Sequence, residues 1–193
     1  MHPNPGFRAD PATLLARAAE IGFAHLFVAT PVGPMVAHAP LTLHGTELRF
    51  HLARANRLHP HLANGRVLAS VAGPHGYVSP NWYQSPGSQV PTWNYETIEI
   101  EGTVRSLAEA DLLDQLDALA DAHEPRPNPW TRAKADPTTI ATLLRAIDGY
   151  AITPTAVRGT TKLSQNKAAV DRAGVVAGLR AQGNAALAEA MAE

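Results

Sequence analysis

Residues 23–52 read FAHLFVATPVGPMVAHAPLTLHGTELRFHL, and this stretch decides the fold class. It contains three runs rich in β-forming residues, at 23–30, 35–43 and 46–52. The turn sequence PVGP (31–34) separates the first two runs, and His44-Gly45 separates the last two. Strands joined by such short connections lie antiparallel, because a parallel neighbour needs a long crossover. The stretch therefore predicts a meander of three antiparallel strands.

The flanking sequence extends the same pattern. Before the stretch, Asp10-Pro11 is typical of a helix start, an N-cap followed by proline, and Gly22 is expected to end that helix. After it come a short helical stretch and three more strands, at 56–65, 66–73, 95–104 and 150–157. Because no crossover helices alternate with the strands, this order predicts an α+β fold, a small antiparallel β-barrel with peripheral helices.

Further helices are expected after the fifth strand. Ser106-x-x-Glu109 matches a capping box before a run in which leucines share one face. Asp136-Pro137 repeats the cap-plus-proline signal, and Gly149 is expected to end that helix. The tail is expected to be helical over 171–183 and again toward the end of the chain.

The connection between the fourth and fifth strands is unusually long. Residues 79–94 read SPNWYQSPGSQVPTWN, with three prolines and no periodicity. Long ordered loops of this kind are often functional. They lead into YETIEIEGTV (95–104), which alternates as an ordinary half-buried strand. The crowding of Thr92, Trp93 and Asn94 at its start is the feature that needs an explanation.

The composition excludes several classes of function. The chain has 193 residues, a formal net charge of −1 and no cysteine. Disulfides, thiol nucleophiles and thiolate metal ligands are therefore excluded, and no global field directs the chain to nucleic acid or anionic lipid. The polar N-terminus MHPNPGFRAD lacks the apolar core of a signal peptide. No stretch approaches the roughly 18 apolar residues that span a bilayer, so we expect a cytoplasmic protein.

Standard catalytic and metal-binding motifs are absent from the sequence. It has no G-x-S-x-G, no P-loop and no G-x-G-x-x-G. Among its nine histidines, His59 and His61 cannot both point to one site from a regular helix. Two of His38, His44 and His51 could approach each other on adjacent predicted strands. Without H-E-x-x-H or a carboxylate-flanked cluster, however, no metal site is expected.

Basic residues become more frequent toward the C-terminus, at positions 158, 162, 167, 172 and 180. No helix-turn-helix pair with a recognition helix accompanies them, and the chain as a whole is slightly acidic. A solvated face is the favoured interpretation, so direct DNA binding has no support in the sequence.

Two short polar stretches point to a ligand. In HLARAN (51–56), a strand ends and offers Arg54 and Asn56 before a short helix, an arrangement that can hold a phosphate dianion. KLSQNK (162–167) places amide, hydroxyl and ammonium donors in one short run after a strand, which suits a ring edged with carbonyls and nitrogens. Taken alone, HLARAN is equally compatible with a surface turn, and KLSQNK is more readily explained as a polar loop.

Together with other segments, these stretches resemble one family, the PaiB-type FMN-binding negative transcriptional regulators. The resemblance covers roughly residues 7–183. The matching segments are HLARAN, GYVSPNWY (76–83), VPTWNYETIEIEG (90–102), DAHEPRPNPW (121–130), KLSQNK and DRAGVVAGL (171–179). The resemblance implies a single split-barrel domain over 1–193, similar to the pyridoxamine-phosphate oxidase flavoproteins. Its barrel core is expected at about 23–157, and the C-terminal motif and helix at 158–193. It also implies a homodimer with FMN at the subunit interface.

The resemblance implies four groups of cofactor-binding residues. Those matching the strand and turn that hold the FMN phosphate are His51, Arg54 and Asn56. Those on the preceding strand, near the flavin, are His38 and Pro40. Those entering the fifth strand, close to the cofactor or the dimer seam, are Thr92, Trp93, Asn94 and Thr97. Those of the C-terminal motif, near the isoalloxazine, are Lys162, Ser164, Gln165 and Asn166.

Three functions are compatible with this resemblance. The first is a flavin-binding transcriptional regulator of the repressor kind. No DNA-reading element is found, so repression through redox or ligand sensing or through a partner stays open beside direct DNA binding. The second is an FMN-dependent oxidoreductase on a small substrate, in which the cofactor would supply the chemistry that the protein motifs lack. The third is a haem-binding relative on the same barrel, in which a histidine would ligate iron.

Overall fold

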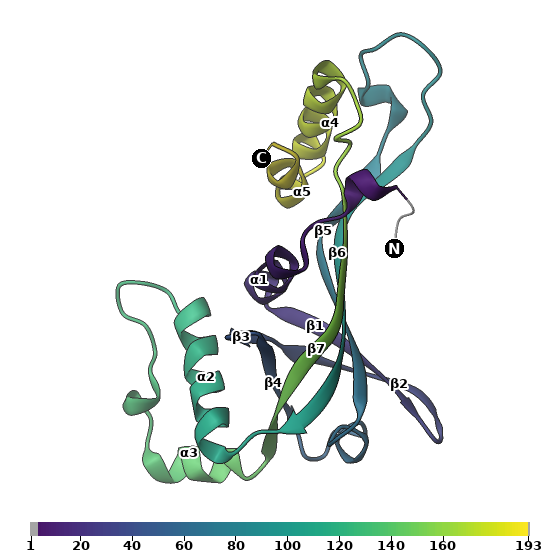
Figure 1. The fold of residues 1–193 in the computed structure, drawn as a ribbon. Coiled ribbons are helices and arrows are strands. Elements are labelled where there is room, and N and C mark those ends of the chain that lie inside the picture. The colour runs from purple at the N-terminus through teal and green to yellow at the C-terminus, as the bar shows by residue number, and fades with distance from the viewer. Residues whose placement is uncertain (1–3, 193) are drawn as a thin grey trace. The chain divides into compact units, whose positions relative to one another are not determined.

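The computed structural model describes residues 4–192, so the first three residues of the polar N-terminal stretch lie outside it. The strands are β1 Phe23–Thr30, β2 Gly33–Pro40, β3 Thr42–His44, β4 Glu47–Ala53, β5 Arg66–Val78, β6 Thr92–Ser106 and β7 Ile147–Lys162. The helices are α1 Pro11–Ile21, α2 Glu109–His123, α3 Pro137–Leu144, α4 Ala169–Ala181 and α5 Ala185–Ala192 (Figure 1). No helix within residues 4–192 is long and apolar enough to cross a membrane.

The chain divides into two compact units. The barrel unit comprises Pro11–Val71 and Glu99–Val157. The helix-pair unit comprises the residues up to Asp10, Ala72–Ile98 and the residues from Arg158 onward. Strands β5, β6 and β7 each contribute residues to both units.

All seven strands contribute to the barrel unit, in the order β2-β1-β5-β6-β7-β4-β3. β1 pairs antiparallel with β2 and β5, and β4 pairs antiparallel with β3 and β7. β2 also contacts β4, although four strands separate them in the sheet, so the sheet curls on itself. The predicted antiparallel barrel with peripheral helices is confirmed.

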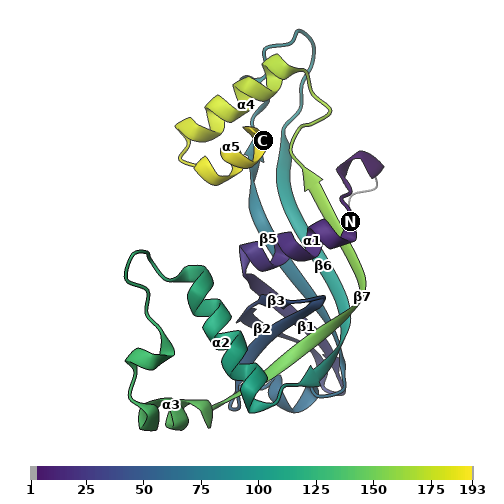
Figure 2. The same ribbon diagram turned by 60° about the vertical axis from the view of Figure 1, so that its left-hand side comes forward.

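Alternation along β4 shows how the barrel unit fills its interior. Leu48, Phe50 and Leu52 are buried, whereas Arg49 and His51 between them are half-buried. Burying such a large apolar side chain stabilises the fold by about 1.5–3 kcal/mol. Helix α2 contacts β3 and β4, and α1 contacts β3 (Figure 2). The polar side chains of β4 are therefore available to α2 rather than to the core.

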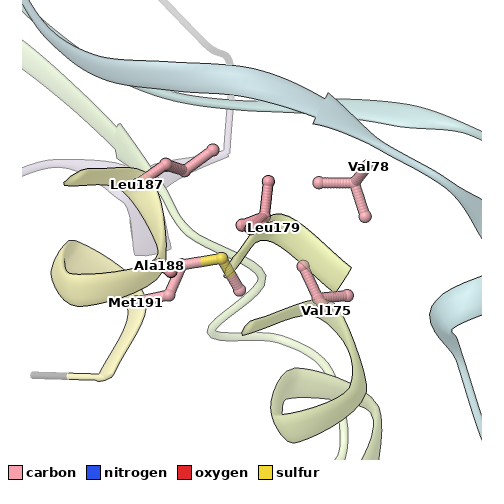
Figure 3. Close-up of a cluster of buried hydrophobic side chains, with 6 residues drawn as sticks. All are labelled: Val78, Val175, Leu179, Leu187, Ala188 and Met191. Carbon is pink, nitrogen blue, oxygen red and sulfur yellow. The ribbon is translucent and has the colours of Figure 1, made fainter. Parts of the chain in front are cut away.

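The helix-pair unit has its own small core. α4 and α5 lie against each other, and their apolar side chains meet the end of β5 (Figure 3). The buried residues of this cluster are Val78, Val175, Leu179, Leu187, Ala188 and Met191. Gly183, with φ = 79°, ends α4 and lets the chain reverse into α5. This core fixes α4 beside the polar segments at the start of β6 and the end of β7.

The structure differs from the sequence prediction at several boundaries. The expected strand 35–43 is broken at Leu41, whose N–H donates to Gly22 O at 2.8 Å instead of continuing a ladder. Its two halves become β2 and β3 at opposite edges of the sheet, so the meander of three strands is wrong. The capping box at Ser106 is also wrong, because Ser106 ends β6 and Ala108 caps α2 without a side-chain bond.

Other boundaries shift by a few residues. The helix that begins at Pro137 is capped by Asp136 as predicted, but it ends at Leu144 rather than at Gly149. β6 begins at Thr92, so residues 92–94, which were expected to end the long loop, are already in the strand. β7 likewise runs on to Lys162, which places the start of KLSQNK at a strand end. Both changes bring polar motif residues onto the sheet.

Candidate functional site

The start of β6 and the end of β7 are joined by hydrogen bonds in the helix-pair unit. The Lys162 ammonium donates to Thr92 Oγ1 at 2.5 Å and to Trp93 O at 2.6 Å. Burial lowers the pKa of Lys162 below its ordinary value, because desolvation disfavours the charged form. An ammonium group has three N–H donors, so these two bonds leave one for another acceptor.

Asn94 links the same two segments from the inside. Its side chain is fully buried, and its Nδ2 donates to Ser164 Oγ at 2.9 Å and to Met191 Sδ at 3.4 Å. Ser164 has φ = 59°, in the left-handed region that non-glycine residues seldom adopt. Ser164 also hydrogen-bonds Tyr83, whose pKa is raised above its ordinary value mainly by burial. The bond to Asn94 therefore holds Ser164 in a sharp turn directly after β7.

Gln165 and Asn166 complete the KLSQN turn in different ways. Gln165 Nε2 donates to Thr161 O at 2.5 Å and its Oε1 accepts the Leu163 N–H at 2.7 Å, so this side chain closes the turn. Asn166 is exposed, and Thr97 is half-buried further along β6. Direct bonds thus bring together part of the predicted set, which we call the Lys162 cluster: Thr92, Trp93, Asn94, Lys162 and Ser164.

Trp93 gives the Lys162 cluster a flat aromatic surface. Its side chain is 49% exposed, although it is one of the largest apolar side chains of the chain. Its ring stacks on that of His75 from β5, with the centroids 5.9 Å apart and the planes 27° from parallel. Aromatic rings that stack and remain accessible suit a planar ligand.

The loop that leads into β6 is anchored on α4. The Asp171 carboxylate accepts the N–H groups of Gln84 and Ser85, both at 2.8 Å. The N–H of Ser85 contributes most to holding the pKa of Asp171 below its ordinary value. Lys167 donates to Gln89 Oε1 at 3.0 Å. The sequence analysis missed these anchors, although Asp171 and Lys167 lie within the quoted motifs.

Two glycines on α4 make room for Trp82, which lies in a short 3₁₀ helix (Pro80–Trp82). A Cβ atom on Gly178 would overlap the indole ring of Trp82, and one on Gly174 would overlap its carbonyl oxygen. The motifs GYVSPNWY and DRAGVVAGL are therefore two sides of one contact. In the sequence, the spacing of Gly174 and Gly178 by four residues could have indicated a close contact on one face of the helix. It does not identify Trp82 as the residue on the other side of that contact.

A second group of predicted residues lies at the end of β4 in the barrel unit. Arg54 Nη2 donates to Asp148 Oδ1 at 2.9 Å, and the other oxygen of the same carboxylate bonds His59 Nε2 at 2.5 Å. Asn56 shapes the turn between them, because its Oδ1 accepts the Leu58 N–H at 2.9 Å. The Arg54 side chain is 56% exposed, so its guanidinium remains accessible to an anion. Sequence reasoning missed Asp148 and His59.

The other predicted residues of the barrel unit make separate contacts. His51 Nδ1 bonds Gln115 Oε1 of α2 at 3.0 Å, and this glutamine is fully buried. The His38 ring meets that of His25 edge to face, with the centroids 4.8 Å apart. Pro40 pairs across the strands with Phe23. The histidine that approaches His38 is thus His25, on the neighbouring strand, rather than His44 or His51.

A cavity of about 1030 Å³ lies beside Arg54 in the barrel unit. Its walls come from α2, α3, the segment between them and the start of β7, and they include Trp130 and Arg132. The motif DAHEPRPNPW forms part of this wall, where the Glu124 carboxylate accepts the Trp130 N–H at 2.9 Å. Ligand pockets commonly measure about 300–1,000 Å³, so this volume accommodates a small molecule. No group of three or more metal-ligating side chains is found within residues 4–192.

Comparison with known proteins gives the chemistry of the cofactor. Residues 1–156 match the family model "Putative FMN-binding domain". The chain is 32% identical over 119 residues to "Protease synthase and sporulation protein PAI 2" of Bacillus subtilis, covering 61% of this chain and 56% of that protein. It spans about half the length of the first curated relatives it matches.

Solved structures show the fold. The flavocytochrome Anf3 of Azotobacter vinelandii has a TM-score of 0.63 at 15% identity, covering 84% of this chain and 72% of that one. An FAD and heme binding protein of Mycobacterium smegmatis has a TM-score of 0.62 at 18% identity, covering 86% and 78%. At such low identity these likenesses establish the split-barrel fold alone.

Taken separately, the side chains of each group fit one chemical group of FMN. An accessible arginine suits the phosphate, because guanidinium and phosphate form charge-assisted hydrogen bonds. The Trp93 and His75 rings suit the isoalloxazine plane, and the remaining N–H of Lys162 suits its carbonyl oxygens. With the family model matching most of its length, this chain belongs to the PaiB-type FMN-binding family, and FMN is its cofactor.

Proposed function

We propose that this protein is a PaiB-type regulator that acts through its bound FMN rather than through a DNA-reading helix. The observation that carries this proposal is the Lys162 cluster, in which two family motifs 70 residues apart hydrogen-bond to each other. Because Lys162 bonds to Thr92 and Trp93, a ligand that binds on the Trp93 ring is coupled to the conformation of the KLSQN turn. FMN, when bound, supplies one- or two-electron redox chemistry there.

We propose a role for each predicted binding residue within its own unit. Arg54 and Asn56 hold the phosphate of FMN, Arg54 by charge and Asn56 by shaping the turn. Trp93 and Lys162 contact the isoalloxazine, and Ser164 and Gln165 fix the turn that presents them. Asn94 is fully buried, so its role is to position Ser164 rather than to touch the cofactor.

The internal engagement of the C-terminal basic residues supports indirect regulation. Lys162 and Lys167 donate to side chains of their own unit, and Arg172 donates to Met191 O at 2.6 Å. Each of these bonds occupies an N–H group that would otherwise be available to a DNA phosphate. These residues therefore do not form a ready contact surface for DNA, and we expect a partner or a ligand to carry the signal.

An FMN-dependent oxidoreductase is the second candidate. The cavity of about 1030 Å³ in the barrel unit favours it, because a small substrate would have room there beside polar and aromatic walls. We also propose that the protein is a homodimer with the cofactor at the subunit interface. The exposed Trp93 supports this, because large exposed aromatic side chains are enriched where partners bind.

The first experiment is a titration of the flavin-free protein with FMN and with riboflavin, in the native chain and in Arg54→Ala. We expect Arg54→Ala to weaken FMN binding roughly tenfold to a hundredfold, since a hydrogen bond to a charged group contributes about 1.5–3 kcal/mol. Riboflavin, which lacks the phosphate, should bind both proteins equally. Arg57→Ala, a change of a neighbouring exposed arginine, is the matched control. Unchanged FMN affinity in Arg54→Ala would refute the phosphate role.

The FMN-loaded protein then separates the two functions. Bleaching of the flavin by NAD(P)H, followed by turnover with an added acceptor, would favour the oxidoreductase. A regulator acting through FMN should instead bind a partner or an effector differently in its oxidised and reduced states. A salt-dependent shift of promoter DNA by the protein alone would overturn indirect regulation, because it would require a DNA-contacting surface.

A further inference from the structure

Asp148 on β7 holds two basic side chains, Arg54 and His59, at the turn that follows β4. One of its oxygens accepts from Arg54 at 2.9 Å and the other bonds His59 at 2.5 Å. The three side chains are part-exposed, at 56% for Arg54, 34% for Asp148 and 28% for His59. We call these three residues the Asp148 triad. None of the segments that carry the family resemblance contains Asp148 or His59.

Aromatic contacts connect the His59 ring to the buried core of the barrel unit. Phe50 is fully buried and stacks on Tyr150, with the centroids 5.3 Å apart. The Tyr150 ring in turn meets the edge of His59, at 6.2 Å between centroids and 75° between planes. Asn56 fixes the backbone just before His59 by accepting the Leu58 N–H. An imidazole supported in this way by a packed core keeps one orientation beside Asp148.

The charges of the triad decide what it can bind. Arg54 and Asp148 cancel each other, so with neutral His59 the triad carries no net charge. With a protonated imidazole it carries one positive charge, and both cations stay fixed by the same carboxylate. Histidine is the side chain that changes charge between about pH 5 and 8. A phosphate group carries close to two negative charges when the pH is above its second pKa, which is about 6. A second fixed cation next to Arg54 therefore strengthens phosphate binding.

We propose that His59, oriented by Asp148, is the second cation of the FMN phosphate site. This inference rests on the proposed phosphate role of Arg54. Within residues 4–192, the titratable or charged groups that face the His59 ring are Asp148 and Tyr150 of β7, with Arg54 beyond Asp148. A protonated His59 thus binds the phosphate more strongly than a neutral one, and riboflavin, which lacks the phosphate, does not sense this difference.

The test compares His59→Gln with the native chain by fluorescence titration with FMN and with riboflavin, at about pH 6 and about pH 8.5, on either side of the histidine range. Glutamine keeps an N–H donor for Asp148 but removes the charge. Ionisation of the phosphate itself affects both proteins alike and cancels in the ratio of their dissociation constants. The matched control is His61→Gln, which changes the other histidine of the same 3₁₀ turn (His59–His61).

We expect His59→Gln to weaken FMN binding about three- to tenfold near pH 6, as for one charge acting across a partly solvated site, and to leave it unchanged near pH 8.5. Riboflavin should bind both proteins equally at either pH, which also shows that the variant is folded. An FMN ratio of one near pH 6, an equal loss for riboflavin, or the same loss in His61→Gln would overturn the inference. Failure of Arg54→Ala to affect FMN would instead remove the phosphate site itself.

Discussion

Asn94 is the residue at which a structural role can be separated from contact with the cofactor. It is fully buried, and its amide bonds both Ser164 Oγ and Met191 Sδ. We expect Asn94→Ala to lower the free energy of unfolding by about 1–3 kcal/mol, because the buried Ser164 hydroxyl loses one of its two side-chain partners and the amide bonds of Asn94 are lost. Urea denaturation followed by circular dichroism measures this change.

The control for this prediction is Asn166→Ala in the same motif region. Asn166 is exposed, so its replacement should change the stability by less than about 0.5 kcal/mol. If Asn166 contacts FMN, as the family resemblance implies, its replacement weakens FMN binding without loss of stability. An Asn94→Ala protein that is as stable as the native chain but has lost FMN binding would contradict the positioning role.

Single residues also show where sequence reasoning stops. TWN and KLSQN were recognised because each is a short, unusual run of polar and aromatic side chains. Arg54 was recognised for the same reason, but its partner Asp148 lies 94 residues away in a plain strand. Nothing in the local sequence marks that aspartate, because its role comes from the antiparallel pairing of β4 and β7. Long-range partners of this kind become visible only in the fold.

Gly178 sets the distance between α4 and the 3₁₀ helix that carries Trp82. Replacing a helical glycine by alanine normally stabilises a helix by about 1 kcal/mol. Here a Cβ would overlap the indole ring, and overpacking costs about 1–3 kcal/mol, so we expect Gly178→Ala to be destabilising. Urea denaturation should show a lower midpoint than for the native chain.

Two further variants test the cause of this loss. Trp82→Leu in the Gly178→Ala background relieves the overlap, so the effects of the two changes should not add. Ala177→Ser, an exposed change on the same helix, should stay within about 0.5 kcal/mol of the native chain. A Gly178→Ala protein that is more stable than the native chain would show that α4 and Trp82 are not in close contact.

Elements with strong local signals were the ones predicted well. α1 runs from Pro11 to Ile21, β1 from Phe23 to Thr30, and Asp136 caps α3, all as proline, glycine and capping residues indicated. The long strands β6 and β7 were predicted too short, because their ends carry polar motif residues that look like loop. The break at Leu41 was missed, because the apolar run continues through it while the backbone changes its partner strand.

At the scale of the whole molecule, three strands are shared by the two units. β5, β6 and β7 run through both, so the barrel unit and the helix-pair unit cannot be separated by cutting at one linker. Arg54 with its triad belongs to the barrel unit, whereas Trp93 and Lys162 belong to the helix-pair unit. The sequence placed all of these residues in one domain through the family resemblance, but composition alone marks no boundary between the units.

The proposed homodimer gives the last prediction. Phe23 and Phe27 lie on β1 with 49% and 44% of their surfaces exposed, and their partners across to β2 are Pro40 and Val36. An apolar sheet face of this kind favours contact with another protein surface. We expect sedimentation equilibrium to give twice the chain mass of 20.5 kDa for the native protein, and close to 20.5 kDa for the double variant Phe23→Ser/Phe27→Ser.

The control is Val32→Ser in the turn between β1 and β2. Val32 is 79% exposed, more than either phenylalanine, but it lies at the tip of the hairpin rather than on its face. It should leave the mass unchanged, because a single exposed apolar residue contributes little to association. A native protein that stays monomeric with FMN bound would refute the homodimer. A dimer that survives the double variant would keep the homodimer but move its interface off this face of β1.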